Sequence, residues 1–409
     1  MSEDQPLPTG LQLTSLDSVF REHPHEYLDR LRAQDPIHRD AELGRLFLTR
    51  FEDVREVVSN RSLSVDPRKA PAGSYYRRAV IGTTPFEAFQ PTMLHLDDPD
   101  HKRLRAIVTQ AFNESSVDAF RPRIREIAGA LLDTLAERDS FDVIAEYAAP
   151  LPIIVIAQML GVDPADLEQF KRWSEPLTQI FNPARTSGQQ AELAAAQFGL
   201  SVYFQRAAEA RRHQRGADLI SALVAAEESR ERLTQREITL TCNLLLVAGN
   251  ITTTGLIGNG ALALLNHPDQ LARLLANPKL VPNAIEEILR YDPPISQTSR
   301  VAIHPLVIGG TQVQAGESIT ASLLAAGHDP SRHPRPHCFD IERGDTTHLA
   351  FGGGAHYCLG APLARAEAQV AIPLLFERFP GLCLDRGRAI ERKPVPVFNA
   401  LKALWVRVV

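Results

Sequence analysis

The residues best suited to chemistry lie in one short segment, FGGGAHYCLGAPLAR, which runs from Phe351 to Arg365. Three consecutive glycines precede Cys358, and glycine permits backbone conformations and close approaches that other residues do not allow. A helical pattern begins after Gly360, so Cys358 lies just before a helix N-terminus. The free N–H groups and the dipole of that helix favour an anion, so we expect a lowered pKa for the thiol. The segment therefore predicts a thiolate ligand for a metal.

Cys358 is one of four cysteines in the sequence, and Cys242, Cys338 and Cys383 lack its glycine-rich setting. Zinc and iron–sulfur clusters need about four protein ligands, so one thiolate is too few for either. Haem supplies the equatorial nitrogens itself, so a single thiolate is enough. A thiolate also pushes electron density onto iron, which favours cleavage of the O–O bond.

Length and composition set the class of protein. The chain has 409 residues, of which 44% are hydrophobic and 23% charged, as in an ordinary globular enzyme. A net charge of -5 argues against a nucleic-acid-binding protein and against a polybasic membrane anchor. The N-terminal sequence MSEDQPLPTG has neither the basic region nor the apolar region of a signal peptide. We therefore expect a cytoplasmic protein.

Most of the chain has the periodicity of amphipathic helices joined by polar connections. The expected helices are His23–Gln34, Asp100–Asn113, Val117–Arg138, Pro164–Phe181, Gln189–Arg212, Thr234–Leu265, Pro268–Ala276, Lys279–Tyr291 and Ala361–Phe379. The expected strands are Ile37–Asp40, Leu46–Thr49, Leu306–Ile308, Thr311–Val313, Ser318–Ala321 and Ala403–Val409. Gly309-Gly310 predicts a hairpin turn between two of these strands. The sequence thus predicts a mainly α protein with small β-sheets.

Two segments stand out from this pattern. From Ile238 to Pro268 there is no Asp, Glu, Lys or Arg, yet five threonines make the segment too polar to prefer lipid. We expect a helix buried inside the protein, with Thr234 as its N-cap ahead of Glu237. The irregular connection from Asp329 to Gly354 is rich in Pro, His and Gly, and long irregular segments in compact domains are usually functional.

The segment FGGGAHYCLG, residues 351–360, resembles the haem-binding signature of the cytochromes P450. Three further motifs match in the order of that family, and the resemblance extends over nearly the whole chain, closest to the soluble bacterial class. It implies one domain over residues 1–409 with the cytochrome P450 fold. Haem b would lie between the long central helix and the cysteine loop with its following helix, and Cys358 would bind the iron. The other residues that the signature places beside the cofactor are Phe351, Gly352 and Gly360.

The resemblance also identifies residues for the two haem propionates. His101 and Arg105 have the family's H-x-x-x-R spacing, which puts both side chains on one helix face. Arg300 and His356 match two further propionate partners. Arginine and imidazolium pair with carboxylates through charge-assisted hydrogen bonds, so this set of donors suits two carboxylates.

Glu287 and Arg290 carry the family's E-x-x-R motif, and Arg343 matches its third partner. At i,i+3 the two charges lie on one face of a helix. The resemblance implies that the pair is buried and fixes the segment that leads to the cysteine, without taking part in the chemistry.

Within the uncharged helix, residues 248–253, Ala-Gly-Asn-Ile-Thr-Thr, resemble the family's A-G-x-(D/E)-T-(T/S) motif. Ala248 and Gly249 are small enough for haem and dioxygen to lie against the helix, and Thr252 is expected to bond back to a carbonyl one turn earlier. Ile251 replaces the acid that helps to relay protons in the family. Water with Thr252 and Asn250 could form another relay, or the substrate could supply a polar group. Alternatively, the enzyme could be a peroxygenase or a nitric-oxide reductase.

The resemblance implies a haem-thiolate monooxygenase that inserts one oxygen atom from O2 into a mainly apolar small molecule. No flavin or nicotinamide fingerprint is present, so we expect electrons from a ferredoxin and its reductase. Lys102, Arg103 and Arg365 flank the cysteine side in the family layout and could meet that acidic partner. We expect a monomer with no nucleic-acid or membrane partner. The implied substrate contacts are Leu94, Phe181, Leu244, Val247, Ile295, Gln297, Thr298 and Phe398.

Overall fold

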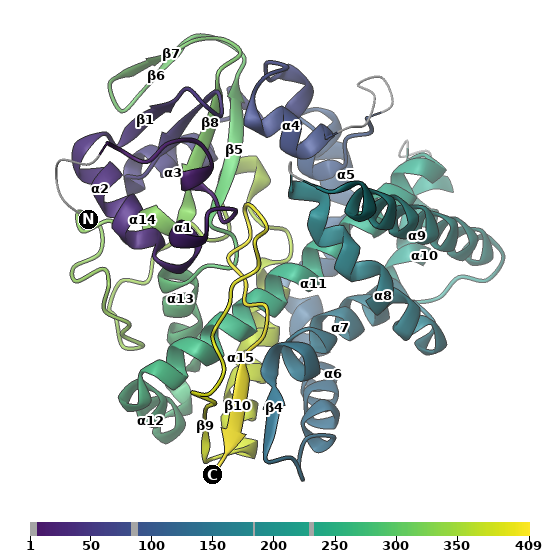
Figure 1. Cartoon of the computed structure of the whole chain (residues 1–409). Coiled ribbons are helices and arrows are strands. Elements are labelled where there is room, and N and C mark those ends of the chain that lie inside the picture. Colours follow the sequence, from purple (N-terminus) through teal and green to yellow (C-terminus); the bar gives the residue numbers. More distant parts are fainter. Residues whose placement is uncertain (1–5, 83–88, 183–184, 229–232) are drawn as a thin grey trace.

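Helices form most of the protein, and small sheets lie in separate places, one beside the N-terminal helices and another near the C-terminus (Figure 1). The structure is a computed structural model that describes residues 6–82, 89–182, 185–228 and 233–409. The helices are α1 Ser18–Glu22, α2 Pro24–Gln34, α3 Phe51–Ser59, α4 Tyr75–Ile81, α5 Asp100–Thr109, α6 Glu114–Asp133, α7 Pro150–Leu160, α8 Leu167–Leu177, α9 Ser187–His213, α10 Leu219–Glu228, α11 Gln235–Asn266, α12 Pro268–Ala276, α13 Val281–Tyr291, α14 Leu323–Gly327 and α15 Ala361–Arg378.

The largest sheet joins strands from both ends of the sequence. Its order is β1-β2-β8-β5-β3, with β2 and β8 parallel and the other neighbours antiparallel. A second sheet has the order β4-β10-β9, and β6 and β7 form a hairpin. Both glycines of that hairpin's turn have positive φ, 51° at Gly309 and 87° at Gly310, as a two-residue turn requires. The strands are β1 Ile37–Asp40, β2 Arg45–Leu48, β3 Leu63–Ser64, β4 Ser140–Asp142, β5 Gln297–Ala302, β6 Leu306–Ile308, β7 Thr311–Val313, β8 Ser318–Ser322, β9 Leu382–Leu384 and β10 Trp405–Val408.

The uncharged helix α11 runs through the middle of the protein and packs against α7, α9 and α15 (Figure 1). Thr234 accepts a hydrogen bond from the backbone of Glu237, whose side chain accepts one from the backbone of Thr234, so the predicted cap is confirmed. Among the helices that the structure describes, α11 is the one long and apolar enough to span a membrane by length and composition. Half of its most apolar window is buried by other parts of the protein, which is typical of a core helix.

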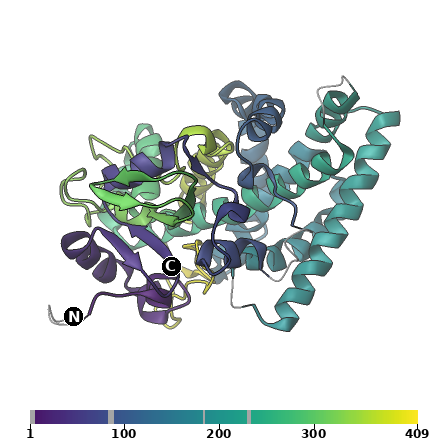
Figure 2. The same ribbon diagram turned by 90° about the horizontal axis from the view of Figure 1, so that it is seen from above.

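Seen from above, the N-terminal segments and the sheet around β8 lie on one side, and the helices from the middle of the chain lie on the other (Figure 2). The main hydrophobic core lies among α6, α7, α11, α13 and α15. A smaller core lies between the large sheet and α3. The segment with Cys358 contacts both sides, because the 3-10 turn before it packs against α3 and the helix after it, α15, packs against α6 and α11.

Several elements differ from those predicted. The stretch expected as one helix, Pro164–Phe181, is a turn of 3-10 helix, then α8, then a second 3-10 turn from Thr178 to Phe181. Pro176 lies in the last turn of α8, where its missing N–H helps to end the regular helix. Helix α7 was not predicted because its sequence is almost entirely apolar and has no amphipathic period.

Candidate functional site

Cys358 lies between a 3-10 turn, Gly354–His356, and the start of α15. Its backbone N–H donates to the carbonyl of Phe351 at 2.9 Å, which closes the loop. Burial raises the pKa of the Cys358 thiol, although the backbone of Gly360 and the charge of Arg105 oppose that effect. The expectation of a lowered pKa was therefore wrong for the polypeptide itself, because desolvation of the thiolate outweighs the helix N-terminus.

The glycines before Cys358 are required by the packing of α3 against the loop. Gly352 and Gly354 have φ of 68° and 63°, in the region that favours glycine. A Cβ on Gly353 would lie 2.8 Å from Cγ2 of Val58, and one on Gly354 would lie 3.0 Å from the Val58 carbonyl oxygen. Gly360 has φ of -83° and no protein atom within 4 Å of an added Cβ. Close approach of α3 thus explains the glycines at positions 353 and 354.

The four predicted basic residues cluster around this loop. The rings of His101 and His356 are stacked with their centroids 4.0 Å apart. Arg105 donates to the carbonyl of Tyr357 at 2.6 Å, and the charge of Arg300 influences His356. Within the described part of the chain, neither Arg105 nor Arg300 forms an ion pair. The protein therefore concentrates basic groups here without placing a carboxylate against the two guanidinium groups.

This cluster suits an anionic group from outside the chain. Arg300 is almost fully buried, and Nε2 of His101 is buried without a hydrogen-bond partner among the described residues. Burial, together with the charges of the neighbouring His101 and Arg300, lowers the pKa of His356 to about 3. Buried donors of this kind are costly unless an acceptor satisfies them. The two propionates of a haem fit this set of donors.

One face of α11 is left partly exposed although the next turns of the helix are buried. Five residues at spacings of three and four positions share this face, namely Leu244, Val247, Ala248, Ile251 and Thr252. Oγ1 of Thr252 donates to the carbonyl of Ala248 at 2.7 Å, so the expected bond to the preceding turn is present. The face is apolar apart from this hydroxyl.

Asn250 and Gly249 do not share that face. Asn250 is buried, and its side-chain oxygen accepts from Oγ1 of Thr254 at 3.4 Å. Residues two positions apart on a helix do not face each other, so the structure does not bring Asn250 together with Thr252. A Cβ on Gly249 would lie 3.5 Å from Ile156 of α7, so that side of the helix is already covered. Of the two small residues, only Ala248 lies on the exposed face.

The predicted E-x-x-R pair is present and fully buried. Nε of Arg290 lies 2.7 Å from the carboxylate of Glu287, and neither side chain is exposed. Arg343 donates to the same carboxylate at 3.0 Å. Arg290 also donates to the carbonyls of Gly327 and Pro336, at 2.6 and 2.8 Å. One carboxylate and two guanidinium groups thus tie α13 to the irregular segment that leads to Cys358.

Comparisons with known proteins agree with this arrangement. The family model for cytochrome P450 matches residues 167–395. The cytochrome P450 monooxygenase PikC of Streptomyces venezuelae is 39% identical, over 98% of this chain and 94% of its own. The chain belongs to the cytochrome P450 family. Its cofactor is therefore haem b, and it is a haem monooxygenase.

Further relatives of this P450 support the same assignment. The vitamin D(3) 25-hydroxylase of Pseudonocardia autotrophica is 38% identical, over 93% of this chain and 92% of its own. A crystal structure of P450BioI, in complex with an acyl carrier protein that bears hexadec-9Z-enoic acid, superposes with a TM-score of 0.87. It is 35% identical and covers 96% of this chain and 99% of its own. The cytochrome P450 fold is thus confirmed.

Several predicted substrate contacts of the P450 lie near the first strand residues after α13. Ile295 pairs with Phe398 in an isolated β-bridge, so these two residues are brought together. Gln297 begins β5 and is buried. The hydroxyl of Thr298 accepts from Arg300 at 3.3 Å, which links this strand to the basic cluster.

The structure gives less support for two other predicted substrate contacts. Leu94 lies in a 3-10 turn, Met93–His95, and 43% of it is exposed. Phe181 ends the 3-10 turn after α8, and its side chain is outside the part of the structure that is described.

The basic residues expected to meet a redox partner are largely engaged within the protein. Arg103 pairs with Glu237 of α11, and Arg365 donates to both oxygens of Glu286, at 2.7 and 2.8 Å. Both arginines are thus paired within the protein and only partly exposed, whereas Lys102 is exposed. Glu286 was not predicted, because its partner Arg365 lies 79 positions away in the sequence.

Glu286 also accepts from His348 at 3.0 Å. Burial alone would raise the pKa of Glu286, but hydrogen bonds from Arg365 and His348 outweigh burial and lower this pKa to about 2. This second, partly buried carboxylate therefore joins α13 to the first turns of α15, the helix that follows Cys358.

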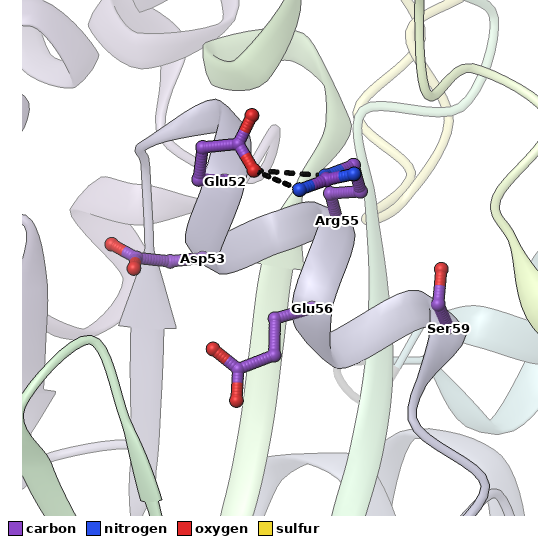
Figure 3. Close-up of a pocket in the computed structure, with 5 residues that line it drawn as sticks. All are labelled: Glu52, Asp53, Arg55, Glu56 and Ser59. Atoms are coloured by element: carbon purple, nitrogen blue, oxygen red, sulfur yellow. Dashed lines mark hydrogen bonds and ion pairs between the residues drawn. The ribbon is translucent and has the colours of Figure 1, made fainter.

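A separate pocket lies on α3, lined by Glu52, Asp53, Arg55, Glu56 and Ser59 (Figure 3). Figure 3 shows Arg55 paired with Glu52 along the helix, and both side chains are well exposed. This charged surface hollow holds none of the predicted site residues.

Proposed function

We propose that this protein is a haem-thiolate monooxygenase that inserts one oxygen atom from O2 into a mainly apolar small molecule. In this proposal a ferredoxin and its reductase supply the electrons, and residues 1–409 form one haem domain that acts as a cytoplasmic monomer. Cys358 is the iron ligand. When bound, the haem supplies oxygen activation at a thiolate-ligated iron. The observation that carries the proposal is the set of basic groups around the partly buried Cys358.

The basic cluster would hold the propionates through its two arginines and two histidines. Arg105 and Arg300 can each offer a planar pair of N–H donors to a carboxylate. Nε2 of His101 is the buried donor or acceptor that still needs a partner. Because His356 stacks on His101, it orients that ring. Phe351, Gly352 and Gly360 would lie beside the cofactor in the loop.

Thr252 holds the one hydroxyl on the exposed face of α11. Because Oγ1 directs its hydrogen to the carbonyl of Ala248, it can accept a hydrogen bond from water through its lone pairs. The apolar neighbours Val247 and Ile251 exclude water from the rest of this face. Proton delivery would thus depend on water held at Oγ1 of Thr252.

An apolar substrate is supported by the side chains of this region. Leu244, Val247 and Ile251 lie on the exposed face of α11, and Ile295 and Phe398 lie together at the start of β5. Two similar proteins are named for vitamin D(3) and for a complex with hexadec-9Z-enoic acid, and both of these molecules are mainly apolar.

The absorption spectrum of the reduced carbon monoxide complex tests the ligand assignment. We expect the strongly red-shifted band of a thiolate ligand, and its loss in Cys358→Ala. Cys383→Ala is the matched control, since Cys383 is an exposed cysteine elsewhere. Persistence of the band in Cys358→Ala would refute the assignment. Turnover of apolar compounds that shift the haem spin state, with NADH and a ferredoxin pair, then tests the reaction.

A second candidate function is a peroxygenase or a nitric-oxide reductase. It is favoured by Ile251, which stands where the family's proton-relaying acid is expected. Ile251→Asp discriminates between the two candidates. A large gain in product per NADH in this variant supports the monooxygenase. The second candidate is supported if the variant shows no gain and if peroxide or nitric oxide sustains turnover of the unaltered enzyme.

A further inference from the structure

Three histidines from distant parts of the sequence meet outside the haem site. His25 lies in the first turn of α2, His328 directly follows α14, and His337 lies in the irregular segment before Phe339. Figure 1 shows α2 and α14 side by side. One potential ligand nitrogen from each ring can be chosen so that all three lie within 4.8 Å of one another. The ring centroids of His25 and His328 are 4.0 Å apart, and that of His337 is 5.3 and 5.1 Å from them.

The hydrogen bonds of His328 leave one ring nitrogen available. Its Nδ1 lies 3.1 Å from the carbonyl oxygen of Leu324. A carbonyl can only accept, so Nδ1 carries the hydrogen and Nε2 of the neutral ring keeps its lone pair. The residue is fully buried, and Nε2 has no hydrogen-bond partner among the described residues. A buried nitrogen with an unused lone pair requires an explanation.

His337 and His25 each also have a ring nitrogen that can serve as a ligand. Nε2 of His337 lies 2.8 Å from the carboxylate of Asp29, which leaves Nδ1 as the ring's free acceptor. A carboxylate on the outer nitrogen is the usual support for a histidine that binds a metal. Nδ1 of His25 is also buried without a hydrogen-bond partner in the described part of the protein.

We propose that His25, His328 and His337 form a zinc site, with Asp29 orienting His337 and water completing the coordination. Three imidazole nitrogens suit Zn²⁺, which they bind at about 2.0–2.1 Å. Tetrahedral ligands at that length lie about 3.3 Å apart, so the nitrogens must move closer together. The side chain of His337, which is 49% exposed, can make that movement.

The position of the site indicates a structural role. Arg290 donates to the carbonyls of Gly327 and Pro336, which directly precede His328 and His337. Zinc would connect α2 to the same irregular segment to which Arg290 donates its hydrogen bonds. A bound metal would therefore stabilise the connection between the N-terminal helices and the segment leading to Cys358.

Zinc binding to the full-length, haem-loaded protein without a histidine tag tests the proposal. We expect one zinc per chain after dialysis against micromolar zinc chloride, measured by elemental analysis alongside the haem iron. The zinc K-edge absorption spectrum should show nitrogen ligands, and zinc should raise the thermal unfolding temperature, because it binds the folded state alone.

His337→Ala is the main variant because His328 is buried and its replacement could prevent folding. We expect the zinc affinity to fall at least about tenfold in His337→Ala, and to fall by a smaller factor in Asp29→Asn. His304→Ala, at an exposed histidine elsewhere, is the control and should bind zinc as the unaltered protein does. Absence of bound zinc, or equal affinity in His337→Ala and His304→Ala, would overturn the proposal.

Discussion

Replacement of Arg290 by methionine tests how strongly the buried ion pair fixes the haem-binding region. The side chain makes two hydrogen bonds to Glu287 and three to backbone carbonyls, and it is fully buried. Removing one partner of a buried ion pair costs about 3–5 kcal/mol, because the other charge stays buried. Arg343 continues to neutralise Glu287 in part, so we expect the lower end of this range.

The matched control is Arg55→Met on α3. Arg55 and Glu52 also form an i,i+3 pair on a helix, but their side chains are 60% and 62% exposed (Figure 3). Exposed pairs contribute about 0.2–1 kcal/mol. The two substitutions therefore change the same chemistry at the same spacing, and burial is the main difference between them.

Thermal unfolding of the haem-loaded proteins measures the effect. An unfolding entropy of about 2.1 cal/mol/K per residue gives about 0.9 kcal/mol/K for 409 residues. A loss of about 3–5 kcal/mol then corresponds to a fall of about 3–6 °C for Arg290→Met, against about 1 °C or less for Arg55→Met. If Arg290→Met does not fold, Arg290→Lys can be used, since lysine keeps the charge but lacks the planar guanidinium. Its fall in unfolding temperature should lie between those of Arg290→Met and Arg55→Met. Equal losses at positions 290 and 55 would refute the reasoning.

Three further predictions concern neighbouring parts of the protein. The folded-state pKa of Glu286, about 2, lies below its ordinary value of 4.5, so this carboxylate stabilises the fold above about pH 5 and loses that effect as the pH falls toward 2. Glu286→Gln should therefore lower stability at pH 7 by at most about 3 kcal/mol and flatten the acid limb of an unfolding curve. Gly354→Ala should cost about 1–3 kcal/mol in thermal unfolding, because it combines positive φ with a close backbone contact, whereas Gly344→Ala, in open space, should change little. Thr252→Ala should lower product formed per NADH about tenfold or more, measured at equal haem content, and an unchanged ratio would contradict the role of its hydroxyl.

The helices that could be predicted are those whose signals are local. The predicted bounds of α11 agree with the observed ones within one residue, because the Thr234 capping box starts the helix and Pro268 follows its end. The local pattern did not indicate strand β5, because Gln297–Ala302 becomes a strand through pairing with β8 and β3, which lie elsewhere in the sequence. Such pairing has no local signature in residues that are neither alternating nor uniformly apolar.

The site was predicted to the extent that its residues occur in short motifs. Cys358 and the cluster of His101 with His356 lie together, although 257 sequence positions separate Cys358 from His101. The direction of the thiol pKa could not be predicted, because burial depends on the elements packed over the loop. The pairing of Arg365 with Glu286 could not be predicted either, because neither residue has a local sequence feature that indicates its partner.

The departure at Ile251 has a structural consequence that the motif alone does not reveal. An aspartate at this position would lie among Leu244, Val247 and Ala248 on the exposed face of α11, one position before Thr252. Asn250 cannot replace that acid, because its amide is buried and contacts Thr254 on another side of the helix. The face therefore contains one polar group, Oγ1 of Thr252, whose own hydrogen is committed to Ala248. A proton that reaches this face must come from bound water or from the substrate, so a substrate with a hydroxyl or amine near the reacting carbon should be oxidised with better coupling than a pure hydrocarbon of the same size.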